Sequence, residues 1–186
     1  MLLHEKLPKL TLPIETKRLI LRSPLLSDIT TSQQAICAYL DWLKKPNTPD
    51  QLKKFIEHCI KNWKKRKNKF PHFVLFLIEK NNNEFIGVVE LHHYNKKMHA
   101  IHVGYWANPT KSKQGYITEA VEACTNYLLN EVGLRKIIIT CDADNLSSRK
   151  IPERLGYVLQ SVMLNDGRDL NTEKIKNTLW YTRRGH

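Results

Sequence analysis

The amino-acid sequence predicts an α/β protein in which a mixed sheet of about seven strands carries helices on both of its faces. Short runs rich in Val, Ile and Phe, at 73–78, 85–92 and 136–141, are typical of strands, and turn residues separate them. Two longer segments, 49–63 and 116–132, repeat apolar residues every three to four positions, which is typical of helices with one buried face. Strands that alternate with helices favour a covered sheet, in the order β-α-α-β-β-β-α-β-α-β-β.

The first half of the chain is expected to contain one strand and two helices before the sheet resumes. Residues 15–23 alternate apolar and polar side chains, so they predict a half-buried strand, and Pro24 ends it. A helix is expected over 29–43. The second helix begins at T-P-D-Q, residues 48–51, where Thr caps the helix, Pro suits its first turn and Gln completes a capping box.

The rest of the chain continues the alternation of strands and helices. The remaining elements are expected at 73–78, 85–92 and about 98–106 (strands), 116–132 (helix), 136–141 (strand), about 147–155 (helix), 157–163 and 178–183 (strands). Pro109 and Gly133 mark the ends of a strand and of a helix. No repeat, low-complexity segment or linker interrupts this pattern, so a single domain over residues 1–186 is expected.

The composition is strongly basic. Thirty Lys and Arg residues against 18 Asp and Glu give a formal net charge of +12. Such a charge attracts anions, which include nucleic acid, a ribosome surface and a phosphorylated cofactor. Many of the cations lie in the run 61–69. A solvated helix end and a docking patch are both compatible with this run.

Neither a membrane segment nor a secretory leader is expected. No apolar stretch approaches the roughly 20 residues that a membrane-spanning helix needs. Charge and proline interrupt the apolar N-terminus at once, so a cytoplasmic protein is expected. The four cysteines, Cys37, Cys59, Cys124 and Cys141, form no C-x-x-C pair and are expected to be reduced core residues.

A basic loop between a strand and a helix is the first candidate site. The stretch 101–120 reads I-H-V-G-Y-W-A-N-P-T-K-S-K-Q-G-Y-I-T-E-A, and its loop contains Lys111, Lys113 and Gly115. Exposed amides at a helix start, next to a glycine, suit a phosphate group. An ordinary basic loop between a strand and a helix has the same composition, so these residues by themselves identify no ligand.

The same stretch resembles the acetyl-CoA-binding motif of the GNAT acetyltransferases, in its segments G-Y-W-A-N-P and G-Y-I-T-E-A. The resemblance implies the GNAT fold, acetyl-CoA as co-substrate and transfer of an acetyl group to an amine. It also implies that the CoA is held by Trp106, Ala107, Lys111, Ser112, Lys113, Gln114, Gly115, Tyr116 and Ile117. Ser112 and Ile117 depart from the family pattern, which has Arg or Gln and a small residue at these positions.

A second segment, D-A-D-N-L-S-S-R-K-I-P-E-R-L-G-Y, is similar to another GNAT signature. The resemblance implies that Asn145 contacts the pantetheine arm or opens the helix, and that Arg149 meets a CoA phosphate. It further implies that Ser148 protonates the departing CoA thiolate. Many relatives use a tyrosine for this step, and Pro152 stands at its position. A proline here removes the N–H that would bond to the carbonyl of Ser148.

The N-terminal half resembles the ribosomal-protein-serine/alanine N-terminal acetyltransferases, in E-T-K-R-L-I-L-R and in the T-P-D-Q-L-K-K-F-I helix. The resemblance implies a protein N-terminal α-amine as acceptor, and it makes Trp42 either a substrate contact or a core residue. Two other functions remain open. One is acetylation of a small amine, such as a polyamine or an antibiotic, and the other is a non-catalytic module that binds nucleic acid or a protein partner. A monomer and a homodimer both fit.

The transfer needs a neutral amine, so a base or a water relay must accept its proton. Relatives commonly have Glu two residues before G-Y-W, and His102 occupies that position. If Tyr94 pairs with Met98 across a turn, Glu90 falls opposite His102 on a polar face. Both are candidate bases and acceptor contacts, and a structural role for His102 stays open.

Four histidines near this face, His92, His93, His99 and His102, raise the question of a metal site. Adjacent strand residues point to opposite faces, so only about two of the four could converge. No metal site is therefore expected.

Overall fold

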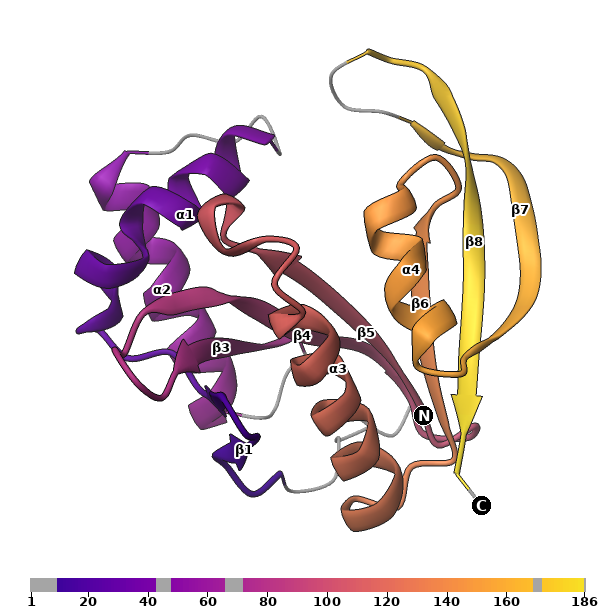
Figure 1. The fold of residues 1–186 in the computed structure, drawn as a ribbon, viewed down its shortest axis with the longest axis horizontal. Helices are drawn as coiled ribbons and strands as arrows, with labels where there is room; N and C mark the ends of the chain where they lie inside the picture. Colours follow the sequence, from indigo (N-terminus) through magenta and orange to yellow (C-terminus); the bar gives the residue numbers. More distant parts are fainter. Residues whose placement is uncertain (1–9, 43–47, 66–71, 169–171, 186) are drawn as a thin grey trace.

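The computed structural model describes residues 10–42, 48–65, 72–168 and 172–185 (Figure 1). In chain order its elements are β1 (Ile14–Glu15), β2 (Leu19–Arg22), α1 (Asp28–Trp42), α2 (Pro49–Lys65), β3 (Phe73–Glu79), β4 (Phe85–Asn95), β5 (Ala100–Ala107), the 3₁₀ turn η1 (Pro109–Lys111), α3 (Tyr116–Asn126), the π-helical turn η2 (Tyr127–Glu131), β6 (Lys136–Asp142), α4 (Leu146–Arg154), β7 (Val158–Arg168) and β8 (Ile175–Arg184). Among these residues, no helix has the length and apolar character that a membrane span requires.

One mixed sheet of eight strands runs through the described residues in the order β1-β2-β3-β4-β5-β6-β8-β7. All neighbours are antiparallel except β5 and β6, which α3 connects as a parallel crossover. The predicted mixed α/β architecture is confirmed. The extra strand arises because the segment 15–23 is divided by a turn. There the Thr16 hydroxyl accepts a hydrogen bond from the Leu19 amide at 2.8 Å.

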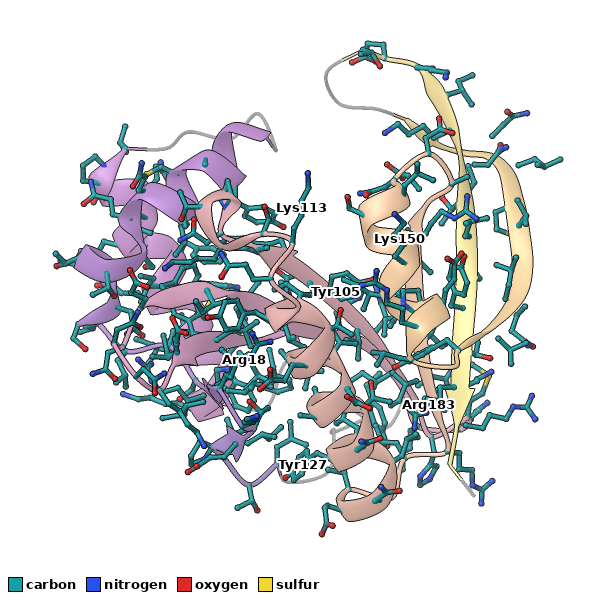
Figure 2. All side chains as sticks on the ribbon, in the orientation of Figure 1. Arg18, Tyr105, Lys113, Tyr127, Lys150 and Arg183 are labelled. Carbon is teal, nitrogen blue, oxygen red and sulfur yellow. The ribbon has the colours of Figure 1, made fainter. Side chains whose placement is uncertain are left out.

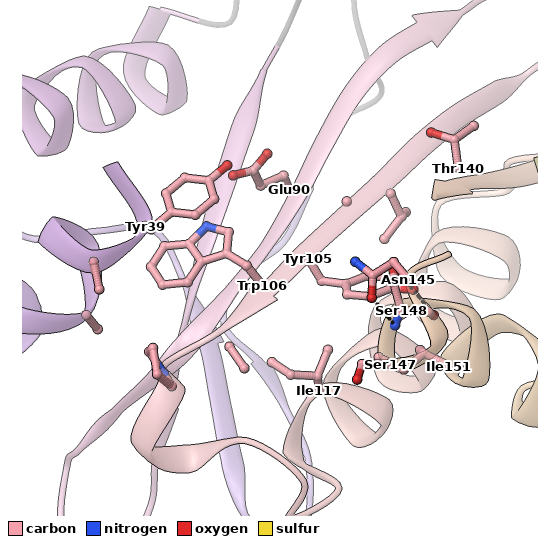
Figure 3. A pocket seen from close by; sticks show the side chains of 16 residues that line it. Tyr39, Glu90, Tyr105, Trp106, Ile117, Thr140, Asn145, Ser147, Ser148 and Ile151 are labelled. Atoms are coloured by element: carbon pink, nitrogen blue, oxygen red, sulfur yellow. Dashed lines mark hydrogen bonds between the residues drawn. The ribbon is translucent and has the colours of Figure 1, made fainter. Parts of the chain in front are cut away.

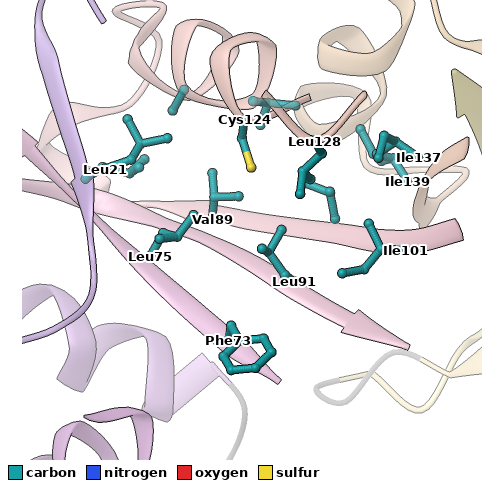
Figure 4. Close-up of a cluster of buried hydrophobic side chains, with 14 of the residues drawn as sticks. Leu21, Phe73, Leu75, Val89, Leu91, Ile101, Cys124, Leu128, Ile137 and Ile139 are labelled. Carbon is teal, nitrogen blue, oxygen red and sulfur yellow. The ribbon is translucent and has the colours of Figure 1, made fainter. Parts of the chain in front are cut away.

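Helices cover both faces of the sheet, as predicted (Figure 1). Because side chains alternate along a strand, β3 contributes to two cores. Val74 and Phe76 pack with α1 and α2, whereas Leu75 and Leu77 belong to the core under α3. Figure 4 shows the second core, in which residues of α3 and η2 lie over β-branched and leucine side chains of the sheet.

The register of β4 and β5 differs from the predicted one. Tyr94 does not pair with Met98. His92 lies opposite His102, Glu90 lies opposite Gly104, and the ladder is irregular between His92 and Asn95. The hairpin turn takes four residues, 96–99, so that Asn95 pairs with Ala100, and a bulge in β4 at His93, whose backbone is left-handed with φ +50°, then shifts the ladder back by one residue. The displacement is two residues, so Glu90 and His102 still share a face.

The central helical segment ends within one residue of the predicted end, but its last part is π-helical. The segment 116–132 forms α3 to Asn126 and then the π-helical turn η2, in which the Val132 amide donates to the Tyr127 carbonyl at 3.0 Å. Gly133, with φ +76°, follows this turn and ends the helical segment, as expected.

The parallel pair at the centre of the sheet separates after a short contact. Pairing between β5 and β6 is confined to Ala100–His102 and Lys136–Ile138. Beyond these residues the two strands diverge, and β6, β8 and β7 swing away from β5 together with α4 (Figure 1). An opening at the carboxyl ends of neighbouring parallel strands is where an α/β sheet offers a binding site.

Candidate functional site

A cleft of about 600 Å³ lies where β5 and β6 diverge. Figure 3 shows Glu90, Tyr39 and Trp106 on one side of this cleft and Asn145 and Ser148 on the other. Its lining residues are Ala35, Ala38, Tyr39, Glu90, Val103, Gly104, Tyr105, Trp106, Ala107, Pro109, Ile117, Thr140, Asn145, Ser147, Ser148 and Ile151. The sequence-predicted residues Glu90, Trp106, Ala107, Ile117, Asn145 and Ser148 are among them.

The predicted anion loop turns directly into α3 at the edge of this cleft. Residues 112–115 are exposed, and Gly115 adopts φ +81° as the residue before the helix. No side chain of the described residues caps this helix start. The first turn of α3 therefore presents backbone N–H groups without a side-chain acceptor, which is the arrangement that suits an anion.

An arginine that sequence reasoning missed braces the same loop. The guanidinium of Arg18 donates to the Gln114 carbonyl at 3.1 Å and to the Glu119 carboxylate at 2.6 Å. It also lies 4.2 Å over the ring of Tyr116. Arg18 precedes β2 and is almost a hundred residues away in sequence, so no local pattern could indicate this contact.

The two lysines of the loop differ in their surroundings. Lys111 forms an ion pair with Glu84, and this hydrogen bond raises the pKa of the lysine. Lys113 is exposed and projects from the loop (Figure 2). The Ser112 hydroxyl donates to the Pro109 carbonyl at 3.0 Å, so it stabilises the turn η1. Of the two lysines, Lys113 has the charge less compensated by a described neighbour.

The opposite wall of the cleft is the start of α4. The side-chain oxygen of Asn145 accepts from the Ser148 amide at 3.0 Å and so caps the helix. Ser148 follows in the first turn, and its hydroxyl donates to the phenol oxygen of Tyr105 at 3.3 Å. The cap therefore orients Ser148 toward β5.

Pro152 has the predicted effect on α4, and Tyr105 compensates for it. Proline has no N–H, so the Ser148 carbonyl has no helical partner at that position. The Tyr105 hydroxyl donates to this carbonyl at 2.9 Å instead. Burial raises the pKa of Tyr105, which keeps the phenol protonated and able to donate. Sequence reasoning did not find Tyr105, because its role depends on a contact between β5 and α4.

Two residues near α4 do not line the cleft. Arg149 does not line the cleft, because its guanidinium donates to the Ala143 carbonyl at 3.2 Å and to Glu153 at 3.4 Å. A contact between Arg149 and a CoA phosphate stays a prediction. Cys141 is buried, and burial raises the pKa of its thiol, so it remains a neutral thiol.

The other wall combines a carboxylate with two aromatic rings. The rings of Tyr39 and Trp106 are stacked, with centroids 4.4 Å apart and planes 10° apart. Beside them, a carboxylate oxygen of Glu90 lies 3.2 Å from Nε2 of His72. The indole N–H of Trp106 is buried and has no hydrogen-bond partner among the described residues. Tyr39 comes from α1 and was missed, because nothing in its own segment indicates a partner on β5.

His102 does not line this cleft. It lines an adjacent cavity of about 540 Å³, together with His92 and His93, and Thr140 borders both spaces. Burial lowers the pKa of His102 and that of His92 to about 4, so both rings are neutral at neutral pH. Glu90 and His102 share a face, as expected, but only Glu90 reaches the cleft.

The expectation that about two histidines converge is wrong. One nitrogen from each of His92, His93 and His102 lies within 4.8 Å of the other two. Strict alternation would place His93 on the opposite face, but the bulge at φ +50° turns it to the same side. His99 is in the exposed turn before β5 and is not part of this group.

Two predictions are only partly within the described residues. Trp42 is the last residue of α1, and its side chain lies outside the described part of the chain. In the basic run, Lys61 and Lys64 are exposed on α2, whereas residues 66–69 are outside the described ranges. A substrate contact by Trp42 and a docking patch at 61–69 therefore stay predictions.

Comparisons with known proteins concern the family and the fold. The sequence profile of the acetyltransferase (GNAT) domain matches residues 18–158. The ribosomal-protein-serine acetyltransferase of Escherichia coli (strain K12) is 30% identical over 100 residues, which cover 51% of this chain and 55% of that protein. The aligned part thus spans little more than half of that relative.

Solved structures share the fold at low identity. The ribosomal L7/L12 α-N-protein acetyltransferase RimL, in complex with coenzyme A, superposes with a TM-score of 0.79 and 19% identity, over 93% of this chain and 98% of that one. The microcin C7 self-immunity acetyltransferase MccE, in complex with acetyl-CoA and AMP, has a TM-score of 0.75 and 19% identity, over 91% and 93% of the two chains. At these identities the likeness concerns the fold.

Proposed function

The chain belongs to the GNAT acetyltransferase family, and on this premise we propose that it acetylates the α-amine at a protein N-terminus, as ribosomal-protein acetyltransferases do. As a member of this family it is an N-acetyltransferase, and acetyl-CoA is its co-substrate. The proposal concerns the acceptor and the residues that act on it.

The loop before α3 is the proposed pyrophosphate site. Residues 112–115 are exposed, and the helix start that follows them has no side-chain cap. Amides at such a helix start stabilise a phosphate by hydrogen bonds and by the helix dipole. Lys113 adds a positive charge at this loop. Arg18 stabilises the loop by its hydrogen bond to the Gln114 carbonyl.

Ser148 is the proposed proton donor. When the amine nitrogen attacks the thioester carbonyl, a C–N bond forms and the C–S bond breaks. The departing thiolate takes the hydroxyl proton of Ser148, which in the free structure is donated to the phenol oxygen of Tyr105 at 3.3 Å and must turn from it for this step. Direct transfer fits the site better than a cysteine intermediate, because burial keeps the Cys141 thiol protonated.

Glu90 is the proposed acceptor of the proton that leaves the amine, either directly or through one water molecule. It lines the cleft opposite Ser148 (Figure 3). This arrangement separates the group that takes a proton from the group that supplies one. His102, which faces the adjacent cavity, is therefore not the base in this proposal.

A single observation carries the choice of acceptor: Glu90 is the one charged side chain among the described residues that line the cleft. A polyamine carries several cations, and each of them would need a carboxylate partner. A protein N-terminus brings one amine, which one carboxylate can serve. The apolar contacts from Ala35, Ala38 and the Tyr39–Trp106 stack suit a short extended peptide of small residues.

The test is thiol release from acetyl-CoA by the full chain with three kinds of acceptor. These are peptides that begin with Ser or Ala, the same peptides with a blocked N-terminus and an internal Lys, and spermidine or an aminoglycoside. Turnover is expected with the free N-termini alone. Turnover with the small amines and none with any peptide would overturn the proposal.

A pair of neighbouring serines tests the proton donor. Ser148→Ala is expected to lower kcat by about 100-fold while the affinity for acetyl-CoA stays unchanged, because only protonation of the thiolate is lost. Ser147→Ala is the matched control, since Ser147 also lines the cleft but makes no hydrogen bond to Tyr105. Equal kcat values for the two variants would contradict this role of Ser148.

A further inference from the structure

The histidine cluster, defined as His92, His93 and His102, lies outside the acetyl-transfer machinery proposed above. One nitrogen from each of these three rings lies within 4.8 Å of the other two. The cluster lines its own cavity of about 540 Å³, and Thr140 borders both this cavity and the cleft. It thus adjoins the cleft near Glu90.

Two features of the sheet bring the three rings together. His92 and His102 are directly opposite each other in the β4–β5 ladder, so their side chains point to the same face. His93 follows His92 in sequence and would point away, but its left-handed backbone, φ +50°, turns it toward the other two. A non-glycine residue in this conformation is uncommon, and such conformations concentrate at functional sites.

The spacing of the nitrogens is close to that of a metal site. Nδ1 of His92 and Nδ1 of His93 are 2.7 Å apart. The centroid of the His102 ring is 5.5 Å from that of the His92 ring and 5.4 Å from that of the His93 ring. Histidine nitrogens bind zinc at about 2.0–2.1 Å, so two ligands of a tetrahedral ion are about 3.3 Å apart. Small ring rotations would bring the third nitrogen within reach.

A carboxylate lies near one of the three rings. Nε2 of His92 and Oε2 of Glu90 lie 3.4 and 3.8 Å from the point where a Cβ would extend from Gly104. If Nδ1 of His92 binds a metal, its Nε2 carries the ring proton near Gly104, where the Glu90 carboxylate also lies. A carboxylate behind a ligating histidine orients the ring and strengthens its donor nitrogen, as in many metal centres.

We propose that the histidine cluster is a binding site for one divalent transition-metal ion, of which Zn²⁺ is the best fit. Imidazole suits Zn²⁺, Cu²⁺ and Ni²⁺, whereas Mg²⁺ and Ca²⁺ prefer oxygen ligands. Three protein ligands leave a fourth position for water or another oxygen donor. Asp166 of β7 is the one carboxylate among the described residues that line the same cavity, so it is the protein candidate for that position.

The proposal is tested on the chelator-treated full chain without an affinity tag of histidines, by titration with Co²⁺ and then Zn²⁺. One ion per chain is expected, with the visible absorption of nitrogen-ligated Co²⁺ and no near-ultraviolet thiolate band. Neither acetyl-CoA nor an acceptor is present, so the result is independent of the acetyl-transfer proposal.

Two matched variants locate the site. His93→Asn removes a ligand without straining the backbone, because Asn tolerates the left-handed conformation. It is expected to weaken Zn²⁺ affinity by at least about ten-fold, since even mutation of a residue that hydrogen-bonds to a metal ligand has an effect of that size. His99→Asn is the control, because His99 has a similar φ, +45°, in the same hairpin but lies outside the cluster.

The Zn²⁺ affinities of the wild-type chain and the two variants decide the proposal. Loss of binding in His93→Asn with wild-type affinity in His99→Asn, and native circular dichroism in both, would support the site. Absence of binding by the wild-type chain would overturn it. Equal affinity in the two variants, or a thiolate band that places the metal on a cysteine, would do the same.

Discussion

The α4 wall of the cleft and the β4–β5 wall hold their polar side chains by different means. In α4 the main contact is local, since Asn145 caps the helix at Ser148, three residues away. On the other wall, Tyr39 of α1 stacks on Trp106 of β5, and Glu90 of β4 contacts His72 before β3. The α4 wall is therefore encoded by a short sequence motif, whereas the β4–β5 wall forms only when segments distant in sequence pack together.

Tyr105 joins the two walls. Its hydroxyl donates a hydrogen bond to the Ser148 carbonyl and accepts one from the Ser148 hydroxyl. The carbonyl is available for this bond because Pro152 has no N–H to offer it. The position of the proposed proton donor therefore depends on a local cap and on one contact across the cleft.

The largest effect is expected from the packed wall. Glu90→Gln should lower kcat by about 100-fold or more, because the amine proton then has no carboxylate to receive it. Steady-state thiol release measures this change, and a calorimetric titration with acetyl-CoA should give the wild-type affinity. Glu122→Gln, an exposed position on α3, is the control variant. A wild-type kcat in Glu90→Gln would mean that a different group acts as the base.

A double-mutant cycle tests the contact between the walls. Tyr105→Phe should lower the free energy of unfolding by about 1–3 kcal/mol, because the Ser148 carbonyl loses its hydrogen bond. In a Pro152→Ala background the loss should be smaller, since residue 152 then has an N–H for that carbonyl. Denaturant unfolding of the four proteins measures the coupling. Equal losses in both backgrounds would show that Tyr105 does not compensate for the proline.

The smallest effect is expected from the local wall. Asn145→Ala removes the helix cap and should cost about 1 kcal/mol of unfolding free energy. Asn145→Ser retains a side-chain acceptor at the cap, so it should restore most of this stability. Thermal or denaturant unfolding distinguishes the two variants. If both lose stability equally, the contribution of Asn145 does not come from capping.

Most elements were predictable because their signals are local. The strand expected at 73–78 is observed at Phe73–Glu79, and the helix expected at about 147–155 is observed at Leu146–Arg154. Apolar periodicity and caps depend on neighbours within a few residues, which a single sequence contains. The register of β4 and β5 was predicted wrongly, because nothing local indicates that the turn takes four residues or that His93 adopts a left-handed conformation.

The sequence by itself determined the kinds of element, the excess of positive charge, the family resemblance and the polar groups available to a site, with Glu90 and Ser148 among them. Only the tertiary structure decided which of these groups meet. It placed Glu90 in the cleft and His102 in the adjacent cavity, directed Arg149 away from the cleft, and brought Tyr105 to Ser148. The physical reason is that such contacts depend on strand register and on packing between distant segments, and one bulge changes what a strand presents to its face.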